Sequence, residues 1–149
     1  MHRRGTSTDM QAGGGPTYTD PVAEISAFLR ERLEFAVRSG IAREKIVLDP
    51  GIGFGKRVEH NLAILGNVSA FVAIGQPVLI GASRKSFLGT VLGLSDPKSR
   101  DAASIACAAI AALGGASILR VHDVAGTCEA LRVCNAVQLG TVKNLPTSF

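Results

Sequence analysis

The sequence has few cysteines, and they follow no pattern that is typical of a metal site or a redox pair. Cys107, Cys128 and Cys134 are an odd number, and none of their spacings matches a CxxC pair or a zinc motif. Isolated cysteines of this kind are typical of reduced, buried thiols in a cytoplasmic protein. We therefore expect three free thiols and a cytoplasmic location.

The sequence also lacks the long apolar segments of secreted and membrane proteins. The first five residues, Met1-His2-Arg3-Arg4-Gly5, contain no apolar core of a signal peptide. The most apolar stretch, 102–119, is rich in alanine and is interrupted by Gly114-Gly115. We expect this stretch to form a packed helix followed by a strand, and we expect no contact with a membrane.

Charge of one sign is only slightly in excess. The formal net charge is +4 over 149 residues, and the basic residues are scattered instead of forming a run that could follow a phosphate backbone. The 46% apolar composition is that of an ordinary globular domain. These features favour a small anionic ligand over a nucleic acid.

The most regular feature is an alternation of helical and extended segments. Three short apolar runs, at 45–48, 78–81 and 117–121, predict buried strands. Helices are predicted from the Asp20-Pro21 cap to Gly40, from 58 to 65 with a possible broken continuation to 74, from the Asp96-Pro97 cap to 113, and from 124 to 137. This alternation is typical of a parallel α/β fold. Residues 5–19 are predicted to be a mobile loop and 140–149 a flexible tail.

A glycine-rich loop, Asp49 to Lys56, follows the first predicted strand. Its glycines are spaced GxGxG, one residue short of a dinucleotide fingerprint, and Arg57 stands where a P-loop needs Ser or Thr. The loop therefore matches neither nucleotide motif, although its backbone must approach some neighbour closely. Asp49 is either a ligand-binding residue or a turn residue held by Pro50.

Polar residues follow the second and third predicted strands. Ser83 and Lys85 come after one, and Arg120 and His122 come at the end of the other, each pair two residues apart and so on a shared face. The carboxyl ends of parallel strands lie together, so these groups should converge. Arg120 in an apolar strand should need an anionic or polar partner, and with His122 it could clamp an anion.

Less specific interpretations of the same residues stay open at this point. Lys85 with Arg84 could be a solvated basic turn, and His2 and His60 could be structural histidines. His122 alone would be read in the same way, but the nearby Arg120 favours a ligand role.

The motifs of the chain resemble those of one known family. They are Met1-His2-x-x-Gly5, Asp49 to Lys56, His60-Asn61-Leu62, Gly75-x-Pro77-Val78-Leu79, Ser83-Arg84-Lys85-Ser86-Phe87 and Arg120-Val121-His122-Asp123-Val124. Over 1–139 the sequence resembles the C-terminal half of the dihydropteroate synthases, the pterin-binding barrel enzymes of folate biosynthesis. The resemblance implies a (β/α)8 TIM barrel, of which this chain would carry the end of strand five through helix eight.

The resemblance also implies a reaction and a set of roles. The reaction joins p-aminobenzoate to 6-hydroxymethyl-7,8-dihydropterin pyrophosphate and releases pyrophosphate and 7,8-dihydropteroate. By the resemblance, Lys85, Arg120 and His122 would be catalytic. The residues implied to contact pterin or p-aminobenzoate are Met1, Asp49, Gly53, Phe54, Gly81, Ser83 and Lys85, while Arg120 and His122 would hold pyrophosphate.

Some features of the family have no counterpart in this sequence. The family uses Mg²⁺ held by an Asn near strand one, an Asp-Gly-Gly-x-Ser-x-Arg-Pro loop over the p-aminobenzoate, and further polar residues on strands three and four. We therefore expect no metal ligand in this chain. Arg3 stands where the family often has methionine. The resemblance further implies a homodimer and a sulfonamide target.

Three hypotheses of function follow. In the first, the chain is the C-terminal portion of a dihydropteroate synthase. In the second, it is a truncated, non-catalytic fragment that self-associates or only binds pterin, because half a barrel leaves open sheet edges. In the third, it belongs to a pterin-dependent methyltransferase, against which the Ser83-Arg84-Lys85 loop and the Arg120 and His122 pair argue.

Overall fold

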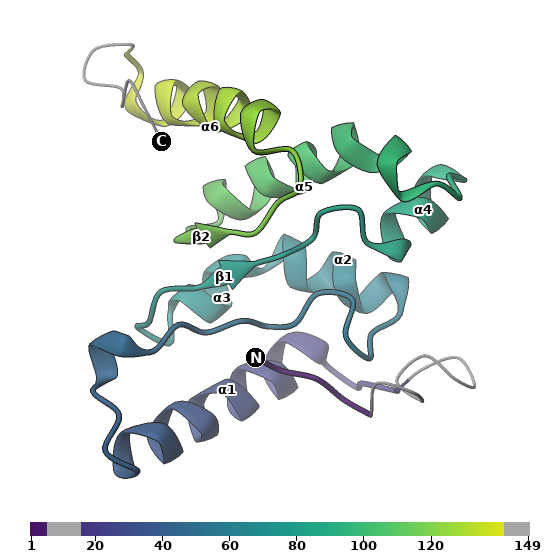
Figure 1. Ribbon diagram of the computed structural model, residues 1–149. Coiled ribbons are helices and arrows are strands. Elements are labelled where there is room, and N and C mark those ends of the chain that lie inside the picture. Colours follow the sequence, from purple (N-terminus) through teal and green to yellow (C-terminus); the bar gives the residue numbers. More distant parts are fainter. Residues whose placement is uncertain (6–15, 142–149) are drawn as a thin grey trace.

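The computed structural model describes residues 1–5 and 16–141, as a stack of short extended segments with helices beside them (Figure 1). Most of the loop predicted for 5–19 and of the tail predicted for 140–149 lies outside these residues. The elements in chain order are α1 (Pro21–Arg38), η2 (Arg43–Lys45), α2 (Val58–Gly66), α3 (Val68–Val72), β1 (Leu79–Ile80), α4 (Ser86–Leu92), η3 (Pro97–Arg100), α5 (Asp101–Leu113), β2 (Ile118–Leu119) and α6 (Val124–Leu139).

The extended segments lie next to one another in the order of the chain. The backbone N–H of His2 donates to the carbonyl of Asp49 at 2.9 Å, and Leu48 forms a parallel bridge with Val78. β1 then pairs in parallel with β2, with Leu79 opposite Ile118. Each carboxyl end therefore lies beside the next, as the predicted α/β alternation requires.

The first predicted strand is much shorter than expected. Only Leu48 takes part in a bridge, and Lys45 belongs instead to the 3₁₀ helix η2, where its N–H donates to the carbonyl of Ala42. Val47 is 42% exposed, so the apolar run is not buried along its whole length. A run of apolar residues predicted an extended segment here, but it did not predict how many of its backbone groups would be paired.

α1 begins and ends where its caps predict. The Asp20 carboxylate accepts from the N–H groups of Val22 at 2.9 Å and Ala23 at 3.0 Å, and Pro21 opens the helix without losing a hydrogen bond. The helix ends at Ser39, and the following residue, Gly40, has a φ of +89°. α1 packs on α2 and α3 through its buried side chains, Ile25, Ser26, Leu29 and Leu33.

The break predicted after the second helix separates α2 from α3 at Asn67. Ile64 on α2 and Val68 and Phe71 on α3 are almost fully buried in one core. This core includes Leu48, Val78 and Ile80 of the extended segments and continues through Cys107 and Ala111 of α5. The helices therefore cover the extended segments along one continuous apolar layer.

The region between the second strand and α5 differs from the prediction. A helix, α4, occupies Ser86–Leu92 and buries Phe87 and Leu88, where no helix was predicted. Asp96 does act as a cap, because its carboxylate accepts from Lys98 N at 3.1 Å, but it caps the 3₁₀ turn η3. α5 itself begins only at Asp101.

The last helix, α6, matches its prediction closely. Asp123 caps it by accepting from Gly126 N at 3.0 Å, and the helix packs on α5. Thr127 is its only described residue in the buried class, while Val124 and Val137 are largely exposed. All three cysteines are free thiols, as expected, with Cys107 buried. None of the described helices is long and apolar enough to span a membrane.

Candidate functional site

The carboxyl ends of the extended segments surround a pocket of about 310 Å³. Its walls come from the glycine-rich loop and from the segments that follow β1 and β2, which are distant in sequence. The lining residues are Phe54, Gly81, Ser83, Lys85, Arg120, Val121 and His122. The convergence predicted for the polar groups that follow the second and third strands is therefore confirmed.

A larger cavity of about 630 Å³ lies between β2, α5 and α6. Its walls are mostly apolar and include Ala112, Leu119 and Leu131. Arg120 contributes to both cavities. The smaller pocket is the better candidate site because it gathers three side chains that can carry positive charge, together with a hydroxyl and an aromatic ring.

Lys85 lies above the ring of Phe54, with its Nζ 4.1 Å from the ring centroid. This is the geometry of a cation–π contact. Burial and then the charge of Arg120 lower the pKa of Lys85, while Asp49 opposes them. The interpretation of Arg84 and Lys85 as one solvated basic turn is therefore wrong, because Lys85 lines the pocket and Arg84 pairs with Asp101.

Arg120 is exposed, which corrects the expectation that it lies buried in a strand and needs a partner there. β2 ends at Leu119, and the N–H of Arg120 still donates to the carbonyl of Ile80 at 3.0 Å. Its guanidinium lies against Gly81, where an added Cβ would be only 3.0 Å from Nε. The side chain therefore rests on the neighbouring segment with its charge open to solvent.

Ser83 and His122 contact each other across the pocket. Ser83 is 7% exposed, and its Oγ lies 2.9 Å from Nδ1 of His122. The same Oγ accepts from the backbone N–H of His122 at 3.2 Å, so it can donate its own proton to Nδ1. In that arrangement the other ring nitrogen of a neutral His122 carries its hydrogen.

Asp49 has a turn role in the structure. Its Oδ1 accepts from the N–H of Gly51 at 2.7 Å, which holds the start of the glycine-rich loop. The side chain is half-buried and carries a charge that acts on Lys56 and Lys85. Asp49 is not among the pocket-lining residues, so this geometry leaves its ligand role a prediction.

Gly53 and Met1 also lie outside the lining of the pocket. Gly53 packs against Lys85, which does line the pocket: a Cβ added at Gly53 would lie 2.9 Å from the Lys85 Cδ. Met1 is 57% exposed and precedes His2, which is bonded to Asp49. Their predicted contacts with pterin therefore remain predictions.

Two of the glycines serve the fold more directly than the pocket. Gly51 and Gly55 have φ values of +75° and +62°, and an added Cβ would collide with the carbonyl oxygens of His2 and Arg4 respectively. The close neighbour of the loop is therefore the N-terminal segment. The spacing of the glycines predicted a close approach but not its partner.

The buried ionisable residues beside this loop are structural. Nδ1 of His2 lies 3.0 Å from the Nζ of Lys56, which also donates to the carbonyl of Phe54 at 3.1 Å. Burial lowers the pKa of His2 to about 4 and that of Lys56 to about 8. His60 accepts from the N–H of Arg57 at the start of α2. His2 and His60 are therefore buried and bonded within the fold, as the structural interpretation predicts.

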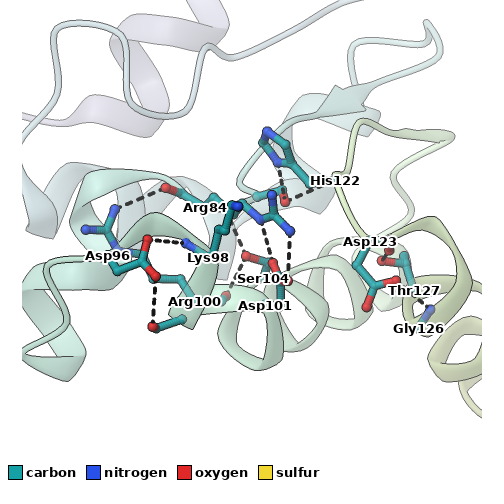
Figure 2. A network of polar contacts seen from close by, with 12 residues as sticks. Arg84, Asp96, Lys98, Arg100, Asp101, Ser104, His122, Asp123, Gly126 and Thr127 are labelled. Atoms are coloured by element: carbon teal, nitrogen blue, oxygen red, sulfur yellow. Dashed lines mark hydrogen bonds and ion pairs between the residues drawn. The ribbon is translucent and has the colours of Figure 1, made fainter.

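Sequence reasoning did not identify the residues that hold the turn at Arg84. The backbone of Arg84 has φ of +58°, and it is the only non-glycine residue in the described ranges with positive φ. Figure 2 shows its guanidinium paired with Asp101 and its surroundings completed by Arg100 and Ser104. These residues lie up to 20 positions further along the chain, so only the fold brings them to the turn.

The family resemblance implies Mg²⁺, which would need several ligating side chains close together. Within residues 1–5 and 16–141, no three His, Cys, Asp or Glu side chains are grouped closely enough to hold a metal ion. We therefore assign no described residue to Mg²⁺ and derive no chemical step through it.

The chain matches a known family over most of its length. The family model described as "Pterin binding enzyme" matches residues 1–122. The chain therefore belongs to the pterin-binding enzyme family. Within that family it is similar to dihydropteroate synthases: it is 44% identical over 136 residues to the one from Escherichia coli K12 and 45% identical over 136 residues to the one from Haemophilus influenzae.

The chain spans about half the length of these curated relatives. The alignment covers 91% of this chain but only 47% of the E. coli protein and 48% of the H. influenzae protein.

Solved structures give the same result. The Yersinia pestis dihydropteroate synthase in its sulfonamide complex superposes with a TM-score of 0.88 at 41% identity, covering 94% of this chain and 50% of that one. The Stenotrophomonas maltophilia enzyme with bound imidazole gives 0.87 at 42% identity, with coverage of 98% and 52%. The chain is therefore an α/β fragment that forms part of a barrel.

Proposed function

We propose that this chain is the C-terminal half of a dihydropteroate synthase, with 1–139 as its barrel portion. The complete protein would join p-aminobenzoate to 6-hydroxymethyl-7,8-dihydropterin pyrophosphate. The observation that carries the proposal is the convergence of Ser83, Lys85, Arg120 and His122 on one pocket. A barrel places its substrates at this carboxyl end of the strands.

Arg120 and His122 are the proposed binding residues for pyrophosphate. Both are exposed at the pocket, and Gly81 lets the guanidinium of Arg120 lie close to the backbone. Departure of pyrophosphate leaves negative charge on its oxygens, which fixed cations and hydrogen-bond donors stabilise. The C–O bond to pyrophosphate breaks with its electron pair leaving on pyrophosphate, while the dihydropterin ring supports the positive charge at the methylene carbon. The neutral arylamine nitrogen bonds to that carbon and then loses one proton to solvent.

Lys85 and Asp49 are the proposed residues for orienting the pterin. The pterin ring offers many donors and acceptors in one plane, which an ammonium and a carboxylate can address. The placement of Lys85 over Phe54 supports this role, because the contact limits where the ammonium can lie. Gly53, Gly81 and Met1 would complete the wall by close approach, as the family resemblance implies.

Ser83 is the proposed contact for the carboxylate of p-aminobenzoate. Its hydroxyl is buried and already contacts His122. The position of the imidazole would therefore affect how the hydroxyl bonds a ligand. A relative supports the chemical class of this ligand: the Xanthomonas albilineans dihydropteroate synthase was solved with 4-aminobenzoic acid. A sulfonamide, as in the Y. pestis complex, would compete at the same place.

The remaining features of the proposal concern groups beyond this pocket. The Mg²⁺ that the family resemblance implies would supply positive charge near the pyrophosphate, and its expected Asn ligand has no counterpart in these 149 residues. A cytoplasmic homodimer completes the proposal. The contacts of Lys85 and the Arg120 and His122 pair favour a synthase over a pterin-dependent methyltransferase.

A second candidate function is a non-catalytic fragment that self-associates. The observation in its favour is the exposed apolar surface of α5 and α6, where Ile110, Leu113 and Val133 are each at least half exposed. Such a surface marks an interaction site or a liability to aggregate. The reading frame upstream of Met1 separates the candidates: the Asn and Asp-Gly-Gly-x-Ser motifs support the synthase, and their absence supports the fragment.

The direct test is turnover of the protein as encoded, with any residues that its reading frame adds to these 149. Lys85→Ala and Arg120→Ala should each lower kcat/KM by about 100-fold or more, because each removes charge from the reacting region. Circular dichroism should remain that of the unchanged protein. Unchanged turnover in either variant would contradict the assigned site.

A further inference from the structure

The turn at Arg84 is unusual because a residue with a long side chain adopts a conformation that favours glycine. Its φ is +58°, and its direct neighbours are Ser83 and Lys85, the two residues of this loop that line the pocket. A Cβ in this region is crowded against the backbone, so such a conformation persists only where surrounding contacts enforce it. The direction of both neighbouring side chains depends on this turn.

The first turn of α5 holds Arg84 by its side chain and its N–H. Nε and Nη2 of Arg84 donate to the two carboxylate oxygens of Asp101 at 2.7 and 2.8 Å, a bidentate pair. The backbone N–H of Arg84 donates to Oγ of Ser104 at 2.9 Å. That hydroxyl in turn donates to the carbonyl of Arg100 at 2.7 Å, which fixes its orientation.

Arg100 holds the carbonyl group of Arg84, which belongs to the next peptide unit. It is only 7% exposed, and its Nη1 donates to the carbonyl of Arg84 at 3.1 Å (Figure 2). Its Nη2 donates to the carbonyls of Leu94 at 2.9 Å and Ser95 at 2.6 Å. The guanidinium also lies against Gly89 of α4, where an added Cβ would stand 2.6 Å from Nη2. A buried cation bonded to carbonyls on three residues fixes their relative positions.

The residues on both sides of this turn, Ser83 and Lys85, line the pocket. Ser83 presents its hydroxyl to His122, and Lys85 presents its ammonium to Phe54. None of Arg84, Arg100, Asp101 and Ser104 lines the pocket. Apart from the charge of Asp101, which acts on His122, they affect a ligand through the residues that do.

We propose that Arg84, Arg100, Asp101 and Ser104 form a positioning network, which holds the strained turn so that Ser83 and Lys85 face the substrates. The inference rests on the proposed function and assigns these four residues as positioning residues of that site. A network that only joined α4 to α5 would affect stability and leave the pocket unchanged, so the two roles can be separated.

Asp101→Ala in the protein as encoded tests the network by kinetics. It removes both acceptors of Arg84, and we expect kcat to fall about 10- to 100-fold, the effect of small misplacement of a catalytic group. The matched control is Glu34→Ala, which breaks a similar pair with Arg43 at 2.7 Å on the surface of α1 and should leave kcat unchanged. Equal kcat values for the two variants, with similar loss of stability, would overturn the proposal.

A pair of substitutions at Arg84 separates strain from charge. Arg84→Ala keeps the unfavourable φ and loses the ion pair, whereas Arg84→Gly loses the ion pair and adopts positive φ freely. We expect the glycine variant to retain at least five times the kcat of the alanine variant. Equal activity of the two would show that the turn geometry is not what the network supplies.

A readout that needs no turnover keeps this inference distinct from the proposed function. An acylating reagent modifies only the neutral amine, so the pH dependence of Lys85 labelling, followed by mass spectrometry, reports the pKa of Lys85. Burial and the charge of Arg120 lower that pKa, and the charge of Asp49 raises it. If the network holds Lys85 in its partly buried position, Asp101→Ala should expose the ammonium, raise its pKa and shift its labelling profile to higher pH. Glu34→Ala should leave the profile unchanged.

The outcomes of the two readouts separate the two claims. Without synthase turnover in the unchanged protein, a shifted Lys85 profile would support the network while the proposed function failed. With turnover, an unshifted profile and unchanged kcat in Asp101→Ala would overturn the network while the proposed function stood.

Discussion

The two ends of the helical layer differ sharply in how well they are covered. α1, at one end of the stack in Figure 1, has Ile25, Leu29 and Leu33 at 3% exposure or less. α6, at the other end, has Val133 at 63% and Val137 at 74%. Burial of a helix face depends on the elements packed against it, and α6 has α5 as its principal neighbour among the described elements.

The candidate site lies between these two regions. Phe54 comes from the loop beside the well-packed core, while Arg120 and His122 come from the segment that leads into α6. One wall is therefore held by a dense set of contacts, and the other depends on a short two-residue strand pair and on the Ser83 contact. The following predictions test this difference, from the largest expected effect to the smallest.

A matched pair of leucines gives the largest contrast. Leu33 in α1 is 3% exposed and Leu139 in α6 is 60% exposed. Leu33→Ala should lower the free energy of unfolding by about 2–5 kcal/mol through lost burial and a cavity, whereas Leu139→Ala should change it by less than about 0.5 kcal/mol. Urea denaturation of both variants measures this, and equal losses would remove the contrast between the two ends.

A matched pair of glycines tests the same contrast in the backbone. Gly51 and Gly140 both have positive φ, but an added Cβ meets the His2 carbonyl at Gly51 and meets nothing within 4 Å at Gly140. Both alanine substitutions should lower the free energy of unfolding, because alanine disfavours positive φ. Gly51→Ala should lower it by about 1–3 kcal/mol more because of the collision. Thermal unfolding of the two variants compares them. A similar midpoint for both would show that the N-terminal segment at His2 can move away from the added Cβ at little cost in stability.

Acid should weaken the well-packed region through His2. Burial lowers its pKa to about 4, below the ordinary value of 6.5. As the pH falls from 6.5 to 4, the unfolded chain takes up the proton first, so stability is lost over that window by about 3 kcal/mol. His2→Gln should flatten the dependence of unfolding free energy on pH between 4 and 6.5. An unchanged slope would assign the acid loss to other groups.

The smallest effect on stability is expected at the exposed face of α6. Val137→Lys should change the free energy of unfolding by less than about 0.5 kcal/mol, because the side chain is 74% exposed. If the apolar face of α5 and α6 joins two copies, the same substitution should lower the sedimenting mass of the protein as encoded. Glu129→Lys, at another exposed position of α6, serves as the control for added charge. A dimer that survives Val137→Lys would exclude this residue from the interface.

Local signals predicted the helices well and the pairing of strands poorly. The caps Asp20 and Asp123 begin their helices as expected, because a carboxylate bonded to nearby N–H groups is a property of a few consecutive residues. The run at 45–48 predicted a strand, but Leu48 alone forms a bridge. α4 was missed because its seven residues follow directly on a polar loop.

The sequence by itself determined the α/β alternation, the family, and the convergence of Ser83, Lys85, Arg120 and His122, since residues that follow parallel strands meet at one edge. Only the tertiary structure decided that Arg120 is exposed, that Gly51 makes room for the His2 carbonyl, and that Asp101 holds Arg84. The physical reason is distance along the chain. Caps and turns are bonded within a few residues, whereas burial, collisions and long-range ion pairs depend on which distant segments the fold brings together.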